Sequence, residues 1–217
     1  MTQNTFKSVF ELMAIVHNFK RVQRTGWNRE AQSGYSQNKV KDAESVADHS
    51  YGLVILCLFM GEIFQLDVKK MLIMALFHDL PEAVTGDHIT ALEKDSQKRF
   101  LAESLKEEKE KLIFLDMFSF LDETTRQKYF AYFVEYLECK TEEAKMVYQL
   151  DKVETIFQAY FYSFGGEDVS VSEFIDSYKE KIDEPILKDL IFAIKEKVKG
   201  EKNGTDKFRS KRVNSYF

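Results

Sequence analysis

The sequence predicts an all-α protein, a bundle of about six to eight helices, because its apolar residues recur at helical spacing along most of the chain. Turn-forming residues are scarce, with 9 Gly and 2 Pro among 217 residues. A β-sandwich or barrel needs such residues at each chain reversal, so the composition argues against both. Hydrophobic residues make up 44% and aromatic residues 14%, which is enough for a packed core and excludes a disordered chain.

The first half of the chain predicts three helices. An amphipathic helix should end near Arg21, since apolar residues recur every three or four positions at Phe6, Val9, Phe10, Met13 and Val16. Residues 26–44 show no period and predict a loop. Ser45 can cap a second helix, and its continuation over 51–64 is apolar nearly all round, which predicts a central position. A third helix should cover 68–78 and end before Pro81.

The second half begins with a charge-rich helix expected over 93–114. Its run 103–111 is rich in Glu and Lys, which predicts a solvated face with i,i+4 ion pairs. Four more helices are expected, over 122–138, 141–162, 171–181 and 185–198. We therefore predict one domain over residues 1–198 and a charged, flexible C-terminal tail over residues 199–217.

Charge and cysteine content limit the function classes. A formal net charge of −5 gives no global attraction to nucleic acid or to an anionic membrane. The 2 cysteines are isolated and fit a reducing compartment. No export signal is visible at the N-terminus, and the longest near-apolar run, 51–60, is too short for a membrane span. These features predict a cytoplasmic protein.

Histidines mark the candidate chemistry. The chain has 4, and two of them lie where apolar helices begin or end: His49 and His78. His78 is followed directly by Asp79, and Asp151 lies at the edge of the apolar stripe of a later helix. Two imidazoles and two carboxylates can hold a divalent metal, with Zn, Fe, Co and Mn suited to imidazole and the carboxylates favouring Mn or Fe.

A purely structural role for these residues competes with the metal-site interpretation. The two histidines can be satisfied core residues, and Asp151 can pair with the neighbourhood of Lys152. Two further carboxylates support chemistry instead, because Glu82 follows His78 by one helical turn and Asp87 follows just beyond Gly86. Charged groups next to an apolar helix need partners or a metal.

Four segments carry a resemblance to a known family. Residues 44–49, 78–87 and 143–152 look like the signature stretches of the HD-domain metal-dependent phosphohydrolases, more narrowly of their 5'-deoxynucleotidase branch. Residues 20–27 look like the N-terminal motif of that branch. The similarity covers residues 5–165 with the motifs in the family's order. It implies an HD-domain helical bundle, commonly homodimeric, that hydrolyses nucleoside 5'-monophosphates.

The resemblance also implies roles for individual residues. One divalent ion per chain (Mn, Co, Fe, Zn, Ni or Mg) would be held by His49, His78, Asp79 and Asp151. Glu82 would be the catalytic carboxylate, Arg21 the phosphate clamp, and Asp87 would lie on the sugar or near the leaving oxygen. The remaining substrate-binding residues would be Val22, His88, Ile89 and Thr90.

The sequence departs from the family beside the expected phosphate clamp. In bacterial members a Trp follows the phosphate-binding Arg and helps reject a ribose 2'-hydroxyl, whereas Val22 follows Arg21 here and Trp27 lies five residues further on. The preference for deoxyribose therefore stays open. Two alternatives also stay open: hydrolysis of a (d)NTP or another nucleotide, and a non-catalytic helical dimer with a structural metal.

Overall fold

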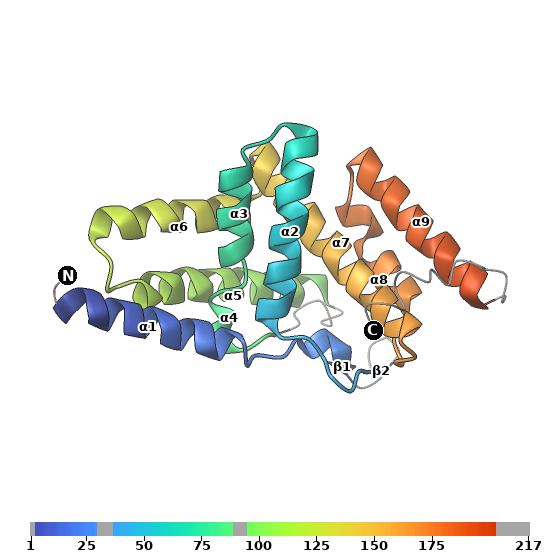
Figure 1. Ribbon diagram of the computed structural model, residues 1–217, viewed down its shortest axis with the longest axis horizontal. Helices are drawn as coiled ribbons and strands as arrows, with labels where there is room; N and C mark the ends of the chain where they lie inside the picture. The colour runs from blue at the N-terminus through green and yellow to red at the C-terminus, as the bar shows by residue number, and fades with distance from the viewer. Residues whose placement is uncertain (1–2, 30–36, 89–94, 203–217) are drawn as a thin grey trace.

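The computed structural model describes residues 3–29, 37–88 and 95–202. The fold class is confirmed, because helices make up nearly all of its regular structure (Figure 1). The helices are α1 Gln3–Phe19, α2 Val46–Phe64, α3 Val68–Phe77, α4 Glu82–Thr85, α5 Ser96–Met117, α6 Glu123–Glu138, α7 Glu142–Phe164, α8 Val171–Tyr178 and α9 Pro185–Lys202, with the 3-10 turns η1 Thr25–Trp27 and η2 Lys179–Lys181. A short antiparallel ribbon pairs β1 Asn28–Arg29 with β2 Asn38–Lys39.

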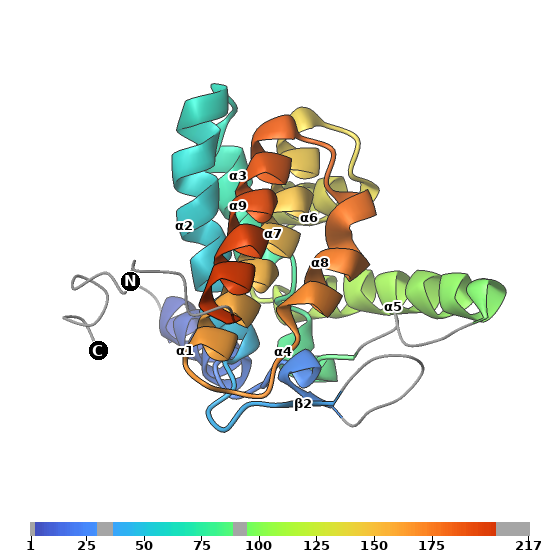
Figure 2. The ribbon, with the colours of Figure 1, turned by 90° about the vertical axis from the view of Figure 1, so that its right-hand side faces the viewer.

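The centre of the bundle is formed by α2, α3 and α7. Helices α2 and α3 stand side by side, and α7 packs against both (Figure 1). Helices α8 and α9 also pack against α7 (Figure 2). The buried side of α7 carries Ala144, Val147, Leu150, Val153 and Ile156, all fully enclosed. This stripe at helical spacing fixes which residues of α7 face inward.

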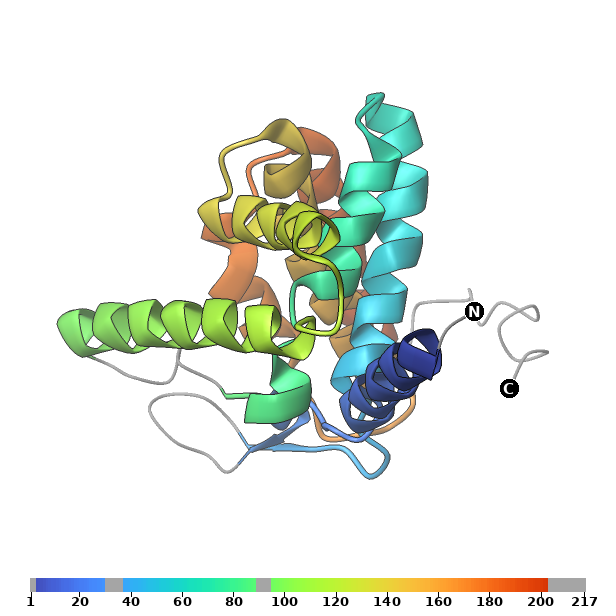
Figure 3. The same ribbon diagram turned by 90° about the vertical axis from the view of Figure 1, so that its left-hand side faces the viewer.

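A second, aromatic core holds α5 against the bundle. Phe114 of α5 stacks on Phe133 of α6, with ring centroids 4.8 Å apart and planes at 10°. Phe77 of α3 meets the Phe114 ring edge-on at 5.4 Å. These contacts anchor the C-terminal end of α5, while its N-terminal half projects away from the bundle (Figures 2 and 3).

Local signals explain where the central helices begin. The Ser45 hydroxyl accepts from the backbone N–H of Asp48, and the Asp48 carboxylate accepts from the backbone N–H of Ser45. This reciprocal capping box satisfies two donors at the start of α2. Asp67 caps α3 by accepting from the N–H of Lys70. Gln65, in the left-handed region at φ 55°, ends α2 and reverses the chain between the two helices.

Helix α2 is longer than its most apolar run suggested. It has 19 residues, and its mean hydropathy over 18 residues is 1.4. Within the described part of the chain it is the one helix that could cross a membrane by length and composition. One side of α2 packs on α3 and α7, but only 33% of that 18-residue window is buried. Tyr51, Phe59 and Ile63 are exposed, so the expected central position holds for one side of the helix only.

Some expected boundaries shift. The segment expected as a loop over 26–44 contains part of η1 and the β1–β2 ribbon. Helix α9 continues to Lys202, past the expected start of the tail at 199. Residues 203–217 lie outside the described residues, so the tail and the domain boundary stay predictions.

Candidate active site

A cavity of about 730 Å³ lies between α4, α5, α7 and α8. Its walls include Asp79, Glu82 and Asp151, together with the basic side chains of Arg24 and Lys106. The cavity therefore brings together residues from both halves of the chain and groups of both charges.

Four donor atoms from three segments meet beside this cavity. His49 Nε2 lies 3.3 Å from His78 Nε2. Asp151 Oδ1 lies 3.1 Å from His49 Nε2, and Asp79 Oδ2 lies 3.1 Å from His78 Nε2. The structure thus brings together the four residues that the resemblance implied as metal ligands.

The other ring nitrogen of each histidine is already engaged. His78 Nδ1 lies 2.9 Å from the carbonyl oxygen of Ala75, which can only accept, so Nδ1 carries the proton. His49 Nδ1 lies 2.5 Å from Glu154 Oε2, one turn along α7 from Asp151. Both Nε2 atoms then face the centre of the cluster. Such outer hydrogen bonds orient the histidine ligands of metal sites. Burial and Arg24 lower the pKa of His49, but Asp151 and Glu154 raise it to about 9, so a metal bound there would displace a proton from this ring.

Asp151 uses its two oxygens differently. Oδ1 faces His49, whereas Oδ2 accepts from Lys152 Nζ at 2.6 Å and from the Tyr136 hydroxyl at 3.3 Å. The pairing with Lys152 that competed with the metal-site interpretation is therefore present, but it leaves Oδ1 in the cluster. Burial raises the pKa of Asp151, but Lys152 and His49 lower it by more. The net pKa therefore lies well below the ordinary value, and the group is anionic.

This donor set fits a divalent metal. His49, His78 and Asp79 offer ligand atoms within 4.8 Å of one another. Two imidazole nitrogens and two carboxylate oxygens suit a transition metal with room for further ligands. Asp48, next to His49, is engaged in the capping box, so it is not counted among the metal ligands.

The structure places Arg24 in the cavity and leaves Arg21 outside it. Arg21 is exposed, and its backbone N–H still bonds to Asn18 at the end of α1. Beyond it, Gln23 pairs with Ser45 as in a β-bridge, and the side chains alternate between outside and inside. Arg24 therefore points inward, whereas Val22 packs into the aromatic core.

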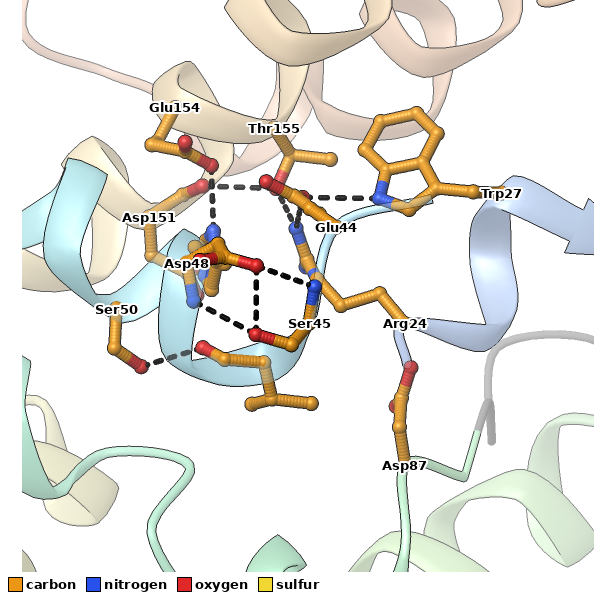
Figure 4. A network of polar contacts seen from close by, with 12 residues as sticks. Arg24, Trp27, Glu44, Ser45, Asp48, Ser50, Asp87, Asp151, Glu154 and Thr155 are labelled. Atoms are coloured by element: carbon orange, nitrogen blue, oxygen red, sulfur yellow. Dashed lines mark hydrogen bonds and ion pairs between the residues drawn. The ribbon is translucent and has the colours of Figure 1, made fainter. Parts of the chain in front are cut away.

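A polar network fixes Arg24 at the cavity wall (Figure 4). Its Nη1 donates to Glu44 Oε1 at 3.2 Å and to Thr155 Oγ1 at 3.3 Å. Trp27, fully buried, donates from Nε1 to the same Glu44 oxygen at 2.9 Å. Burial lowers the pKa of Arg24, but Glu44, Asp151 and two other carboxylates raise it more, so the guanidinium stays charged.

Glu82 lies at the start of α4 and is only 3% exposed. Lys106 Nζ, from α5, donates to Glu82 Oε1 at 3.0 Å. Burial and the charge of Asp79 raise the pKa of Glu82 to about 9, although Lys106 opposes the shift. The expectation of a solvated face over 103–111 is wrong at Lys106 and Glu110, because both turn towards the cavity side and Glu110 is buried.

Asp87 lines the cavity, as Arg24 does. Its Oδ2 accepts from both the backbone N–H and the hydroxyl of Thr25, each at 2.7 Å. His88 is exposed and also lines the cavity. Ile89 and Thr90 lie outside the described residues, so their substrate-binding role stays a prediction.

Comparisons with known proteins agree with this geometry. A family model described as HD domain matches residues 16–190. This chain belongs to the HD-domain family.

Named relatives of this HD-domain chain are similar over most of its length. A Danio rerio protein named 5'-deoxynucleotidase HDDC2 is 30% identical over 190 residues, covering 87% of each chain. A protein of the same name from Dictyostelium discoideum is 30% identical over 191 residues, covering 83% of this chain and 93% of its own. A solved structure of a conserved hypothetical protein from Pyrococcus furiosus superposes with a TM-score of 0.65 at 29% identity, covering 86% of this chain and 99% of its own.

Several residues of this HD-domain site were missed from the sequence. Glu154 follows Asp151 by three positions, so their shared helix face was a usable signal. Arg24 and Glu44 lie inside motifs that the resemblance had already marked. Lys106 had no local signal, because nothing in a Glu/Lys-rich helix distinguishes the one lysine that reaches across to α4.

Proposed function

We propose that this protein is a metal-dependent phosphomonoesterase that releases phosphate from (deoxy)nucleoside 5'-monophosphates. The observation that carries the proposal is the cluster of His49, His78, Asp79 and Asp151, buried except for part of Asp79, beside a cavity that also holds Arg24 and Glu82. The names of the HD-domain relatives, 5'-deoxynucleotidases, point to the same substrates.

One divalent ion per chain would be held by His49, His78, Asp79 and Asp151, with Mn, Co, Fe, Zn, Ni or Mg as candidates. Bound there, it would lower the pKa of a water and polarise a phosphoryl oxygen. Arg24 offers a planar, permanently charged guanidinium to the phosphate, so we assign it the clamp role expected of Arg21. Glu82, one turn past the histidine ligand, would orient the attacking water or pass a proton to the leaving alkoxide.

Because the clamp role moves from Arg21 to Arg24, the residue expected beside the sugar changes as well. Thr25 follows Arg24, so Val22 no longer occupies the position beside the clamp. Asp87 is bonded to Thr25 and faces the cavity, so we propose that it lies next to the sugar. The cavity volume of about 730 Å³ falls within the range typical of small-ligand sites and has room for a nucleoside monophosphate.

A (d)NTP hydrolase and a binding protein with a structural metal are the rivals. A structural metal site is usually closed by four protein ligands and needs no acid–base residue. Glu82 and Arg24 on the wall of an open cavity therefore favour an enzyme.

The test is phosphate release by protein stripped of metal and resupplied separately with Mn, Co, Zn or Mg. The panel comprises dNMPs, NMPs, dNTPs and p-nitrophenyl phosphate. We expect metal-dependent release from monophosphates and little from dNTPs. Release of triphosphate from dNTPs would support the first rival, and tight metal binding without turnover of any substrate would support the second.

We also propose a cytoplasmic homodimer that binds neither nucleic acid nor membrane. The support for a dimer is an exposed apolar stripe along α2, formed by Tyr51, Ile55, Leu58, Phe59 and Ile63. Apolar area of this kind on a helix face is typical of subunit interfaces. Light scattering of the wild type and of Phe59→Glu tests it, since a dimer through this face should dissociate in the variant.

A further inference from the structure

Among the described residues of α5, Lys106 alone bonds to Glu82, the expected catalytic carboxylate. Its ammonium donates to Glu82 Oε1 at 3.0 Å and lies 3.5 Å from Glu110 Oε1, one turn further along α5. The Lys106 side chain is 30% exposed and lines the cavity. Its contact with Glu82 joins α5 to α4 through two residues 24 positions apart in the chain.

The anchoring of α5 gives this contact a fixed geometry. The aromatic core holds the C-terminal end of α5, two helical turns beyond Lys106, through Phe114. Glu110 lies between these points, is 6% exposed and pairs with the Lys106 ammonium. Ordering a long lysine side chain costs rotamer entropy, and the ion pair with Glu110 restricts Lys106 before any substrate binds.

The surroundings of Glu82 explain why a cation is needed there. Asp79 and Asp87 both act on Glu82 electrostatically and disfavour its charged form, as does burial. A buried carboxylate without a partner is costly and turns away or takes up a proton. The ammonium of Lys106 opposes these effects in part and holds one carboxylate oxygen in place, which restricts where the other oxygen can lie.

We infer that Lys106 is a positioning residue that orients the Glu82 carboxylate towards the reacting phosphate. The inference rests on the proposed function, in which Glu82 is the catalytic carboxylate. Lys106 acts through Glu82 in this arrangement and does not itself transfer a proton.

The first test compares three variants with metal restored to each. Lys106→Met should lower kcat on dNMPs on the order of 10- to 100-fold while KM changes by less than about 3-fold, because orientation of an acid–base group is lost and substrate binding is not. Lys106→Arg should recover most of kcat, since it keeps a charged donor. Lys109→Met is the matched control on the exposed side of α5 and should keep wild-type kinetics. A rise in KM with unchanged kcat would overturn the inference.

A double-mutant cycle shows whether Lys106 acts through Glu82. In the Glu82→Gln background, Lys106→Met should change kcat by less than about 2-fold, since residues that act as one unit are not additive. Fully additive losses would overturn the positioning role. Loss of turnover in Glu82→Gln but not in Lys106→Met would overturn this inference alone, whereas full turnover in both variants would also remove Glu82 from the proposed mechanism.

The same four proteins, stripped of metal, give a readout that does not depend on turnover. Urea unfolding midpoints should be non-additive for Glu82→Gln and Lys106→Met, because the two side chains contact each other in the folded protein. Additive midpoints would show that the contact does not form in solution and would overturn the inference. Metal affinity should differ by less than about 3-fold between wild type and Lys106→Met, since the hydrogen bond and ion pairs of Lys106 go to Glu82 and Glu110 and it acts on Asp79 only through its charge.

Discussion

The proposed metal-ligand cluster and the proposed phosphate-binding segment of this protein are neighbours in space but differ in how their side chains are placed. His49 and Asp151 are on long helices, where a buried apolar stripe decides the inward face. Arg24 is in a short extended connection, where pairing of Gln23 with Ser45 decides which side chains face inward. Helix positions and the family motifs therefore pointed to the candidate ligands, whereas the placement of the arginine depended on a contact between segments about 20 residues apart.

The largest expected effect concerns the helix-borne cluster. Asp151→Asn should reduce metal affinity by at least roughly 100-fold, because a buried anionic donor is replaced by a neutral one. Metal content after dialysis, together with titration calorimetry, measures this. Asp48→Asn is the matched control: it removes a negative charge from the first turn of α2, which costs up to about 1 kcal/mol, but should retain the metal. Equal metal loss in both variants would mean that the cap, and not the ligand, governs the site.

The second prediction addresses the irregular segment. Arg24→Lys should lower kcat/KM for dNMPs by roughly 10-fold or more, because an ammonium cannot match the planar fork of a guanidinium. Arg21→Lys should stay within about 2-fold of wild type, since Arg21 is exposed outside the cavity. Steady-state kinetics on both variants decide between the two arginines. The reverse order would return the phosphate clamp to Arg21.

A third, smaller effect should come from the outer contact of His49. A Cβ built on Gly52 would lie 2.6 Å from Glu154 Oε1, so Gly52→Ala must displace the carboxylate that holds His49 Nδ1. Metal affinity should fall by about 10-fold. Gly61→Ala crowds Val68 and Met71 instead, so it should cost stability without changing metal affinity. An unchanged metal affinity in Gly52→Ala would show that Glu154 adapts freely.

The smallest effect concerns Glu110 and is seen only as a function of pH. Burial raises the pKa of Glu110 from its ordinary 4.5 to about 7, although Lys106 lowers it. The folded state therefore binds a proton that the unfolded state releases, and this group's contribution to stability is lost as pH rises from 4.5 to about 7. Glu110→Gln should flatten the fall of the unfolding free energy over that window, as measured by urea unfolding at pH 5 and 7.5. An unchanged slope would contradict the raised pKa.

Much of the fold and part of the site could be predicted from the sequence, for physical reasons visible in particular elements. The helices α2, α6 and α7 lie close to their expected ranges because capping residues and long apolar stripes mark them locally. The expected solvated face of α5 failed at Lys106 and Glu110, because a Glu/Lys-rich helix carries no apolar stripe to show which side is covered.

The sequence by itself determined the all-α architecture, the HD-domain motifs and the four candidate ligands, since each is written in local periodicity or in a contiguous motif. Only the tertiary structure decided that Arg24 and not Arg21 enters the cavity, that Glu154 holds His49, and that Lys106 bonds to Glu82. Each of these depends on two segments far apart in the chain packing against one another. Packing of the whole core sets how two such segments are placed relative to one another, and the sequence of either segment alone does not indicate it.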